Sequence, residues 1–391
     1  MGREGQSRNS PFRAGYTNPT NEGWAEAAIL IPVSFLVAIA QPNPSDFRNW
    51  GLDAVERIQQ DLVMPAGLLY GESAKPGERP LNVAFDWSVG VTLQALNVAS
   101  RADPSLKPRL QGYVEATRAY WNPALPAAGY DVLPMPKPTD RYYDDNEWMV
   151  LALAEASGAL GSKKCLDYAK GAFRYVLSGE DDRLGGGIYW READRASKNT
   201  CSNAPAAAAA IALYRRTREK SYLSNAVKLY AWTRAQLRDP DDGLYWDNIS
   251  VDGKIGRAKW SYNSGLMLRD AAELYDLTKN EQYAADARQI QRSSLKHWVN
   301  LSGALMDDGK FMHLLLENWL LTYRLVPSAD DPRGAIVAGL NFLHANGRDS
   351  LGHYGNRWDQ VAGSKPHSPF NLIDQAAAAR AFLVAAQALT I

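Results

Sequence analysis

Twelve amphipathic helical segments, joined by connections that alternate between short and long, make up most of this chain. Ala, Leu, Arg and Glu dominate windows in which apolar residues recur with the helical period, and the strict alternation typical of strands is scarce. The predicted helices cover residues 46–64, 82–100, 105–121, 143–160, 163–178, 200–217, 222–237, 263–278, 281–298, 312–324, 332–346 and 370–388. This pattern predicts an all-α protein built from six helical hairpins.

The connections indicate how these hairpins are arranged. The short ones, 101–104, 161–162, 218–221 and 279–280, contrast with long ones rich in Gly, Pro, Asp and Trp at 65–81, 122–142, 179–199, 238–262 and 347–369. Even-numbered helices follow the long loops. Three of these helices open with Asn146, Asn203 and Asn263 at nearly equal spacing, which indicates an internal repeat.

Six hairpins of this kind can close into an (α/α)6 toroid, with the even-numbered helices inside and the long loops gathered on one rim. An open solenoid of helix pairs is the alternative architecture. The varied, aromatic long loops favour closure, because an open array usually keeps its loops short and similar. We therefore expect a toroid whose chemistry lies on the rim.

The composition narrows the class of ligand. The chain has 391 residues with 43 basic and 43 acidic side chains, so it lacks the basic surface of a nucleic-acid-binding protein. Two cysteines, Cys165 and Cys201, allow at most one disulfide and exclude a four-thiolate zinc site. The 12 Trp and 19 Tyr residues, many in polar loops, favour a ligand with flat apolar faces and hydroxylated edges, such as a sugar.

The N-terminal part contains the longest apolar run, residues 27–40. It is short for a membrane span, but it fits the apolar region of a secretory signal, and Ala38-Ile39-Ala40 resembles a cleavage site. A buried core segment is the alternative. We predict a leader over residues 1–40, a single catalytic domain over 41–391, a secreted or periplasmic location, and no stable insertion in a membrane.

The most specific motif is a pair of adjacent carboxylates, Asp144 and Asp145, at the start of a predicted inner helix. The simplest interpretation is an N-cap, which accounts for one aspartate better than for two. Neighbouring carboxylates repel, so one is expected to have a raised pKa while the other stays ionised. A glycosidase needs this division between a protonated acid and a nucleophile.

Metal chemistry fits the sequence less well. A magnesium-binding diphosphate site needs a further carboxylate one helical turn after the pair, where Trp148 stands instead. The histidines His297, His313, His344 and His353 show no i, i+4 spacing typical of zinc ligands, and neither does His367. We expect no metal and no cofactor.

Other rim segments carry residues suited to binding sugar. Each has an ordinary alternative: the glycines form a turn, the polar residues cap helices, and the aromatic residues pack in the core. The predicted substrate-binding residues are Asp86, Trp87, Tyr143, Gly186, Gly187, Trp190, Asn203, Tyr262 and Asn263.

Taken together, four motifs resemble those of glycoside hydrolase family 76, the endo-α-1,6-mannanases. They are Tyr143-Asp144-Asp145-Asn146-x-Trp148, Gly185-Gly186-Gly187-Ile188-x-Trp190, Lys198-Asn199-x-x-Ser202-Asn203 and Trp260-x-Tyr262-Asn263. The resemblance spans roughly residues 80 to 390. It implies an (α/α)6 barrel and metal-free retaining hydrolysis, with Asp144 as nucleophile and Asp145 as general acid/base. Glu147, where a small residue is expected, and the segment 311–313 depart from the family pattern.

These observations predict a retaining glycosidase that cleaves the α-1,6-linked backbone of mannan. We expect its partner to be this polysaccharide, and we expect it to act as a monomer. Two alternatives share the fold: a transglycosylase that joins mannan to another glycan, and a mannan-binding protein without catalysis.

Overall fold

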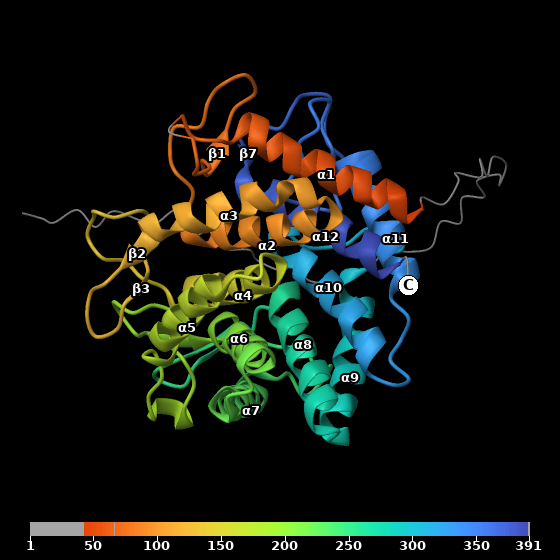
Figure 1. Cartoon of the computed structure of the whole chain (residues 1–391). Helices are drawn as coiled ribbons and strands as arrows, with labels where there is room; N and C mark the ends of the chain where they lie inside the picture. Colours follow the sequence, from red (N-terminus) through yellow and green to blue (C-terminus); the bar gives the residue numbers. More distant parts are fainter. Residues whose placement is uncertain (1–42, 66, 390–391) are drawn as a thin grey trace, which may run out of the picture. The chain divides into compact units, whose positions relative to one another are not determined.

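Six helices form an inner ring in which each helix packs against its two neighbours (Figure 1). The computed structural model of the protein describes residues 43–65 and 67–389, so the predicted leader lies outside the described residues. The inner helices are α2 (Asp86–Ala102), α4 (Tyr143–Ala159), α6 (Thr200–Thr217), α8 (Ser261–Thr278), α10 (Gly309–Leu325) and α12 (Leu372–Ala388). Because α12 also packs against α2, the ring is closed. The (α/α)6 toroid is confirmed, and the solenoid is not formed.

Outer helices alternate with the inner ones along the chain. They are α1 (Pro44–Asp61), α3 (Lys107–Ala116), α5 (Lys163–Leu177), α7 (Lys220–Leu237), α9 (Glu281–Trp298) and α11 (Arg333–Phe342). Two predicted helices are shorter than expected: α3 continues as a 3-10 turn (Thr117–Tyr120), and α11 continues as a π turn (Leu343–Gly347). None of the described helices is long and apolar enough to cross a membrane.

Small residues allow the inner helices to approach one another closely. Runs of buried alanines occupy residues 206–210 of α6 and 376–379 of α12. Gly265 of α8 packs directly on the backbone of α10, where an added Cβ would lie 2.9 Å from the Cα of Leu315. The ring therefore depends on side-chain volume at its helix contacts.

Short antiparallel strands tie the rim loops together. Strand β1 (Ser73–Ala74) pairs with β7 (Phe370–Asn371), which joins the loop before α2 to the loop before α12. The other strands are β2 (Trp121–Asn122) with β3 (Gly129–Tyr130), and β4 (Ser197–Asn199) with β5 (Asn248–Ser250) and β6 (Ile255–Gly256).

A cycle of hydrogen bonds connects the start of each inner helix to the loop that leads into the next one. None of the six inner helices has a side-chain N-cap on the residue before it, within the described residues. Instead, the first backbone N–H of each helix donates to an oxygen of the next loop around the ring. The six bonds are Asp86 to Val132 O, Tyr143 to Trp190 O, Thr200 to Asp247 O, Ser261 to Asp307 Oδ2, Gly309 to Asn356 O and Leu372 to Glu72 O, at 2.7 to 3.1 Å.

Both cysteines are buried and have free thiols. Cys165 lies on outer helix α5, and Cys201 lies at the start of inner helix α6. The single disulfide that the sequence allowed is therefore not formed in the structure.

Replacing Gly265 with Ala tests the close approach of α8 and α10. The added Cβ meets backbone atoms that have no flexible end to move aside, so we expect a loss of about 1–3 kcal/mol of unfolding free energy, as for other overpacked cores. Gly334→Ala is the matched control, because Gly334 lies in α11 with no atom within 4 Å of its added Cβ. Denaturant unfolding measures both; equal effects would contradict the packing argument.

Candidate active site

The adjacent aspartates at the start of α4 differ in their hydrogen-bond partners. The Asp144 Oδ2 atom accepts a hydrogen bond from Trp190 Nε1 at 2.9 Å and one from the Cys201 thiol at 3.5 Å. Its Oδ1 atom accepts the backbone N–H of Asp145 at 3.1 Å. The Asp145 carboxyl accepts no hydrogen bond from any described residue. Three donors thus favour the anion of Asp144, while none favours that of Asp145.

Burial dominates the acidity of both groups. It raises the pKa of Asp144 to about 7, although the bonds from Trp190, Cys201 and the Asp145 amide counteract the rise. Burial, followed by repulsion from Asp144, raises the pKa of Asp145 well above its usual value. The sequence predicts that one carboxyl of the pair stays ionised, but the pKa values of both are raised. The order of the two is the one a nucleophile and an acid require, because Asp144 ionises first.

Two further carboxyls near the pair are completely buried. Asp86, the first residue of α2, and Glu147, one turn into α4, have no hydrogen-bond partner among the described residues. Burial is the main cause that raises the pKa of each well above its usual range, and repulsion from Asp145 adds to it in both cases. The neutral form of each is therefore favoured, which lowers the cost of burying several carboxyls in one interior.

Trp190 links the fold to the acidic pair. Its backbone oxygen accepts the first N–H of α4, from Tyr143, at 3.0 Å, while its indole N–H donates to Asp144. The ring is 39% exposed and packs edge-on against Tyr142, with the ring centroids 5.1 Å apart. Trp190 therefore accepts the first N–H of α4 and also orients the Asp144 carboxylate on the same helix.

An aromatic cluster lies at the starts of α2, α8 and α10. Phe311 is its centre, and its ring centroid lies 4.4 Å from Tyr262, 5.6 Å from Trp260 and 5.8 Å from Trp87. Tyr262 also interacts with the Cys201 thiol that donates to Asp144. This places a partly exposed aromatic surface near the acidic pair, suited to the apolar face of a sugar ring.

Comparison with known proteins identifies the family. The sequence pattern described as Glycosyl hydrolase family 76 matches residues 68–339. The chain belongs to this family. The family resemblance that the four motifs indicated is thereby confirmed.

Solved structures of the family share the fold. The GH76 α-mannanase BT2949 of Bacteroides thetaiotaomicron is 31% identical, with a TM-score of 0.80, over 87% of this chain and 95% of that chain. An inactive variant of the α-1,6-mannanase GH76A of Salegentibacter sp., with two adjacent aspartates replaced, was solved in complex with α-1,6-mannotriose. It is 22% identical, with a TM-score of 0.75, over 88% of this chain and 100% of that chain.

Among curated proteins, the mannan endo-1,6-α-mannosidase DCW1 of Saccharomyces cerevisiae is 26% identical over 196 residues. DCW1 of Candida albicans is 25% identical over 190 residues. The matches cover 46% and 44% of this chain, and this chain spans 42% of the length of each of these relatives.

The structure gives the glycine loop a role other than the predicted contact with sugar. An added Cβ on Gly187 would lie 2.6 Å from the ring of Trp232 on outer helix α7, and one on Gly186 would lie 3.4 Å from the same ring. The buried ammonium of Lys198 donates to the Gly186 carbonyl at 2.7 Å. In this family 76 protein, the two glycines hold the segment that carries Trp190.

Asn203 is likewise a structural residue, since its amide has no atom left for sugar. It accepts the N–H of Ile188 and donates to the carbonyls of Ile188 and Asn199. Asn146 makes the same three bonds at the start of α4, to the N–H of Tyr130 and to the carbonyls of Tyr130 and Tyr142.

The predicted repeat holds for these two asparagines but not for Asn263. In α8, the residue that accepts the corresponding loop N–H, from Tyr245, is Ser264 at 3.1 Å. Asn263 lies one position earlier and is buried, with its amide nitrogen 3.5 Å from Asp247.

Three other predicted sugar ligands are also inaccessible. Tyr143 is fully buried against Tyr175 and accepts a hydrogen bond from Arg195 at 3.1 Å, while Asp86 and Asn263 are 0% exposed. Trp87, Trp190 and Tyr262 do lie in the site. Sequence reasoning missed Phe311 because its segment departed from the family pattern. It also missed Cys201 as a partner of Asp144.

Among the described residues, no group of three or more His, Cys, Asp or Glu side chains is placed to hold a metal ion.

Replacing Trp190 with Phe tests the hydrogen bond to Asp144. Loss of the N–H disfavours the anion and raises the pKa of Asp144, so the acidic limb of the kcat/KM profile moves to higher pH. The expected shift is roughly one pH unit, because hydrogen bonds to charged groups contribute about 1.5–3 kcal/mol and this one is partly exposed. Trp246→Phe is the control, since that indole donates to Asp239 instead. An unmoved acidic limb would show that Trp190 does not tune the nucleophile.

Replacing Glu147 with Gln tests the buried neutral carboxyl. Because burial raises its pKa above the unfolded value, wild-type stability is fully present below about pH 4.3 and declines as the pH rises towards the folded pKa. The variant has no carboxyl to ionise at this position and does not undergo this loss. The Tm of the variant relative to that of the wild type should therefore rise from pH 5 to pH 8. Glu78→Gln, at an exposed position, is the control. A Tm difference that stayed constant with pH would contradict the burial argument.

Proposed function

We propose that this family 76 protein is a retaining endo-acting glycosidase that cleaves α-1,6-mannosidic bonds, with Asp144 as nucleophile and Asp145 as general acid/base. The observation that carries the proposal is the different environment of the two carboxyls. Asp144 holds three hydrogen-bond donors and ionises first, whereas Asp145 keeps its proton. The choice of linkage is supported by the mannanase relatives.

The first step uses both groups at once. Asp145 transfers its proton to the glycosidic oxygen while a carboxylate oxygen of Asp144 bonds to the anomeric carbon, and the bond from that carbon to the leaving sugar breaks. Loss of the proton leaves Asp145 as an anion beside the neutral glycosyl ester, so the two carboxyl groups are never charged at the same time. In the second step Asp145 takes a proton from water, which attacks the anomeric carbon and releases Asp144.

The surroundings of the pair support a sugar substrate. Aromatic rings near the carboxyls belong to Phe311, Trp87, Trp260 and Tyr262. Trp190, which donates to Asp144, is 39% exposed. Sugar rings stack on such faces, and the water they displace strengthens the electrostatic interactions in the site.

We also propose that the protein acts outside the cytoplasm and as a monomer. The apolar run over residues 27–40 and its small-residue end support export. A polysaccharide substrate is found outside cells and needs free access to the rim.

The main test is digestion of debranched α-1,6-mannan. Wild type is expected to release short mannooligosaccharides whose anomeric configuration, followed by NMR, is initially retained, and Asp144→Ala should lower kcat by several orders of magnitude. Asp145→Ala should lose activity on mannan but keep the first step on an aryl mannoside, whose leaving group needs no proton.

Azide separates the two roles. It should rescue Asp145→Ala with retention of configuration and Asp144→Ala with inversion, so exchanged outcomes would reverse the assignment. New glycans formed in the presence of acceptor sugars would indicate a transglycosylase. Binding of mannan with no turnover would indicate a binding protein.

A further inference from the structure

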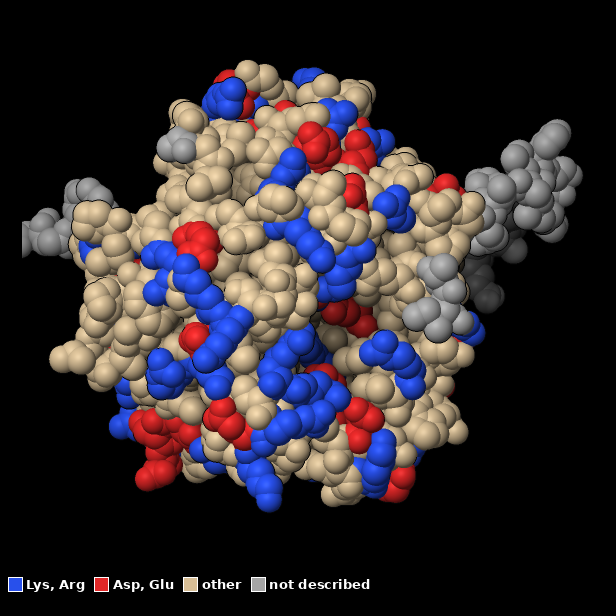
Figure 2. Space-filling view, in the orientation of Figure 1, with Lys and Arg blue, Asp and Glu red and all other residues tan. Residues whose placement is uncertain are grey.

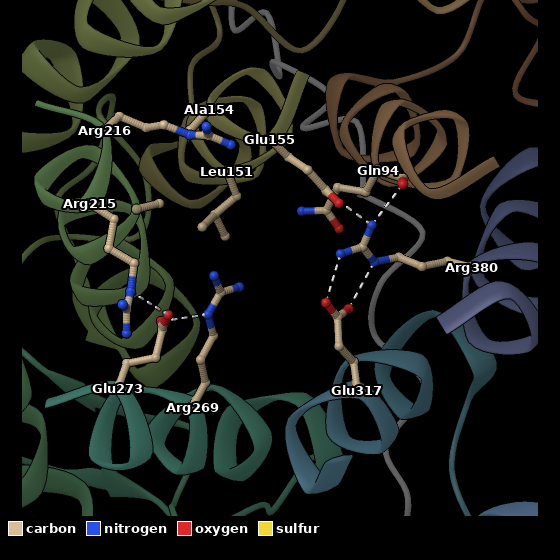
Figure 3. Close-up of a pocket in the computed structure, with 11 residues that line it drawn as sticks. Gln94, Leu151, Ala154, Glu155, Arg215, Arg216, Arg269, Glu273, Glu317 and Arg380 are labelled. Atoms are coloured by element: carbon tan, nitrogen blue, oxygen red, sulfur yellow. Dashed lines mark hydrogen bonds and ion pairs between the residues drawn. The ribbon is translucent and has the colours of Figure 1, made fainter. Parts of the chain in front are cut away.

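A cavity lies at the end of the ring opposite the acidic pair. We call it the far-end pocket, and its volume of about 340 Å³ falls within the range of small-molecule sites. It is formed by the middle and the C-terminal halves of the inner helices (Figure 3). Its lining residues are Gln94, Leu151, Ala154, Glu155, Ala212, Arg215, Arg216, Arg269, Glu273, Glu317 and Arg380.

Figure 2 shows Lys and Arg side chains gathered around a hollow near the middle of the face viewed in Figure 1, with acidic side chains within the hollow. Among the pocket residues, four arginines face three glutamates. The lining therefore contains one more basic than acidic side chain, and its arginines differ in the number of partners they have.

Two of the four arginines each bind two carboxylates. Arg380 is buried and binds Glu317 through two hydrogen bonds of 2.9 Å, and it also contacts Glu155 at 3.1 Å. Arg215 binds Asp276 at 2.9 Å and lies 3.3 Å from Glu273. These pairs use all three glutamates of the pocket.

The other two arginines keep free donor groups. Arg269 uses only its Nε atom, which donates to Glu273 at 3.0 Å, and its two terminal nitrogens point into the middle of the pocket without a partner (Figure 3). Arg216 has no hydrogen bond or ion pair with any described residue. Its guanidinium lies across Gly158 of α4, so close that a Cβ there would collide with it.

A structural role would require different contacts. The C-terminal ends of the inner helices carry partial negative charge, which arginines can neutralise by donating to the last carbonyls. Neither Arg216 nor the terminal nitrogens of Arg269 donate to any carbonyl of the described residues. Their planar donor groups remain available to a ligand, and this geometry suits oxyanions.

We propose that the far-end pocket binds a small dianionic oxyanion of the phosphate type through Arg216 and Arg269. Both guanidinium groups have free terminal nitrogens, so an ion with several oxygens can accept hydrogen bonds from the two together, whereas a monocarboxylate engages only one such planar donor pair. The site is separate from the acidic pair, so binding does not depend on the proposed mannanase activity.

The test is isothermal titration of the full chain with inorganic phosphate at pH 7.5, with sodium chloride keeping the ionic strength constant. We expect one phosphate to bind per chain, and Arg216→Gln and Arg269→Gln each to weaken binding about tenfold or more. Arg174→Gln, at an exposed arginine of outer helix α5 that has no ion pair, is the matched control and should leave binding unchanged. Asp144→Asn should also bind normally, which separates this result from any failure of catalysis.

Two further measurements can overturn the proposal. Sulfate, also a dianion, should compete with phosphate, and acetate should not; equal binding of acetate would contradict a dianion site. Without phosphate, Arg216→Gln should keep or raise the Tm, because it removes an unpaired positive charge. A clear fall in that Tm, or phosphate binding equal in the wild type and both arginine variants, would show that these arginines serve the fold instead.

Discussion

The cycle of hydrogen bonds from the inner helix starts to the neighbouring rim loops is the interaction on which the rest of this structure depends. Each inner helix lacks a side-chain cap of its own, so its first N–H is satisfied only when the next hairpin is in place. The bond from Leu372 to Glu72 joins the last helix to the first loop, and the β1–β7 pair reinforces that junction. Closure of the ring and the conformation of the rim loops therefore depend on the same hydrogen bonds.

The same cycle positions the candidate chemistry. The backbone oxygen of Trp190 accepts the first N–H of α4, and its indole N–H donates to Asp144. The carboxylate is therefore oriented by the loop of the next repeat. Asn203 and Lys198 hold the segment that leads to Trp190, and Trp232 fills the space beside its glycines. Residues that do not face the site thus affect it indirectly, because they hold the indole ring of Trp190 in place.

Ionisable side chains occur at both ends of the ring, and the two ends accommodate their buried groups differently. Near the rim, burial raises the pKa values of Asp86, Glu147 and Asp145 well above their usual range, and three hydrogen-bond donors favour the anion of Asp144. At the far end, Arg380 and Arg215 pair with glutamates from several inner helices. The free donor groups of Arg216 and Arg269 distinguish the far-end pocket from a network in which every donor has a partner.

The sequence by itself determined the twelve helices, the alternation of their connections, the closed toroid and the acidic pair, because helical periodicity and loop composition are local properties. It did not determine which polar residues reach a ligand. Asn203 and Tyr143 carry polar groups suited to binding sugar, but those groups form hydrogen bonds within the fold. Phe311 and Cys201 have roles that depend on neighbours on other helices. Only the tertiary structure decided these roles. The partners that bury, orient or ionise each side chain lie about one hairpin away along the chain, and ring closure brings them into contact.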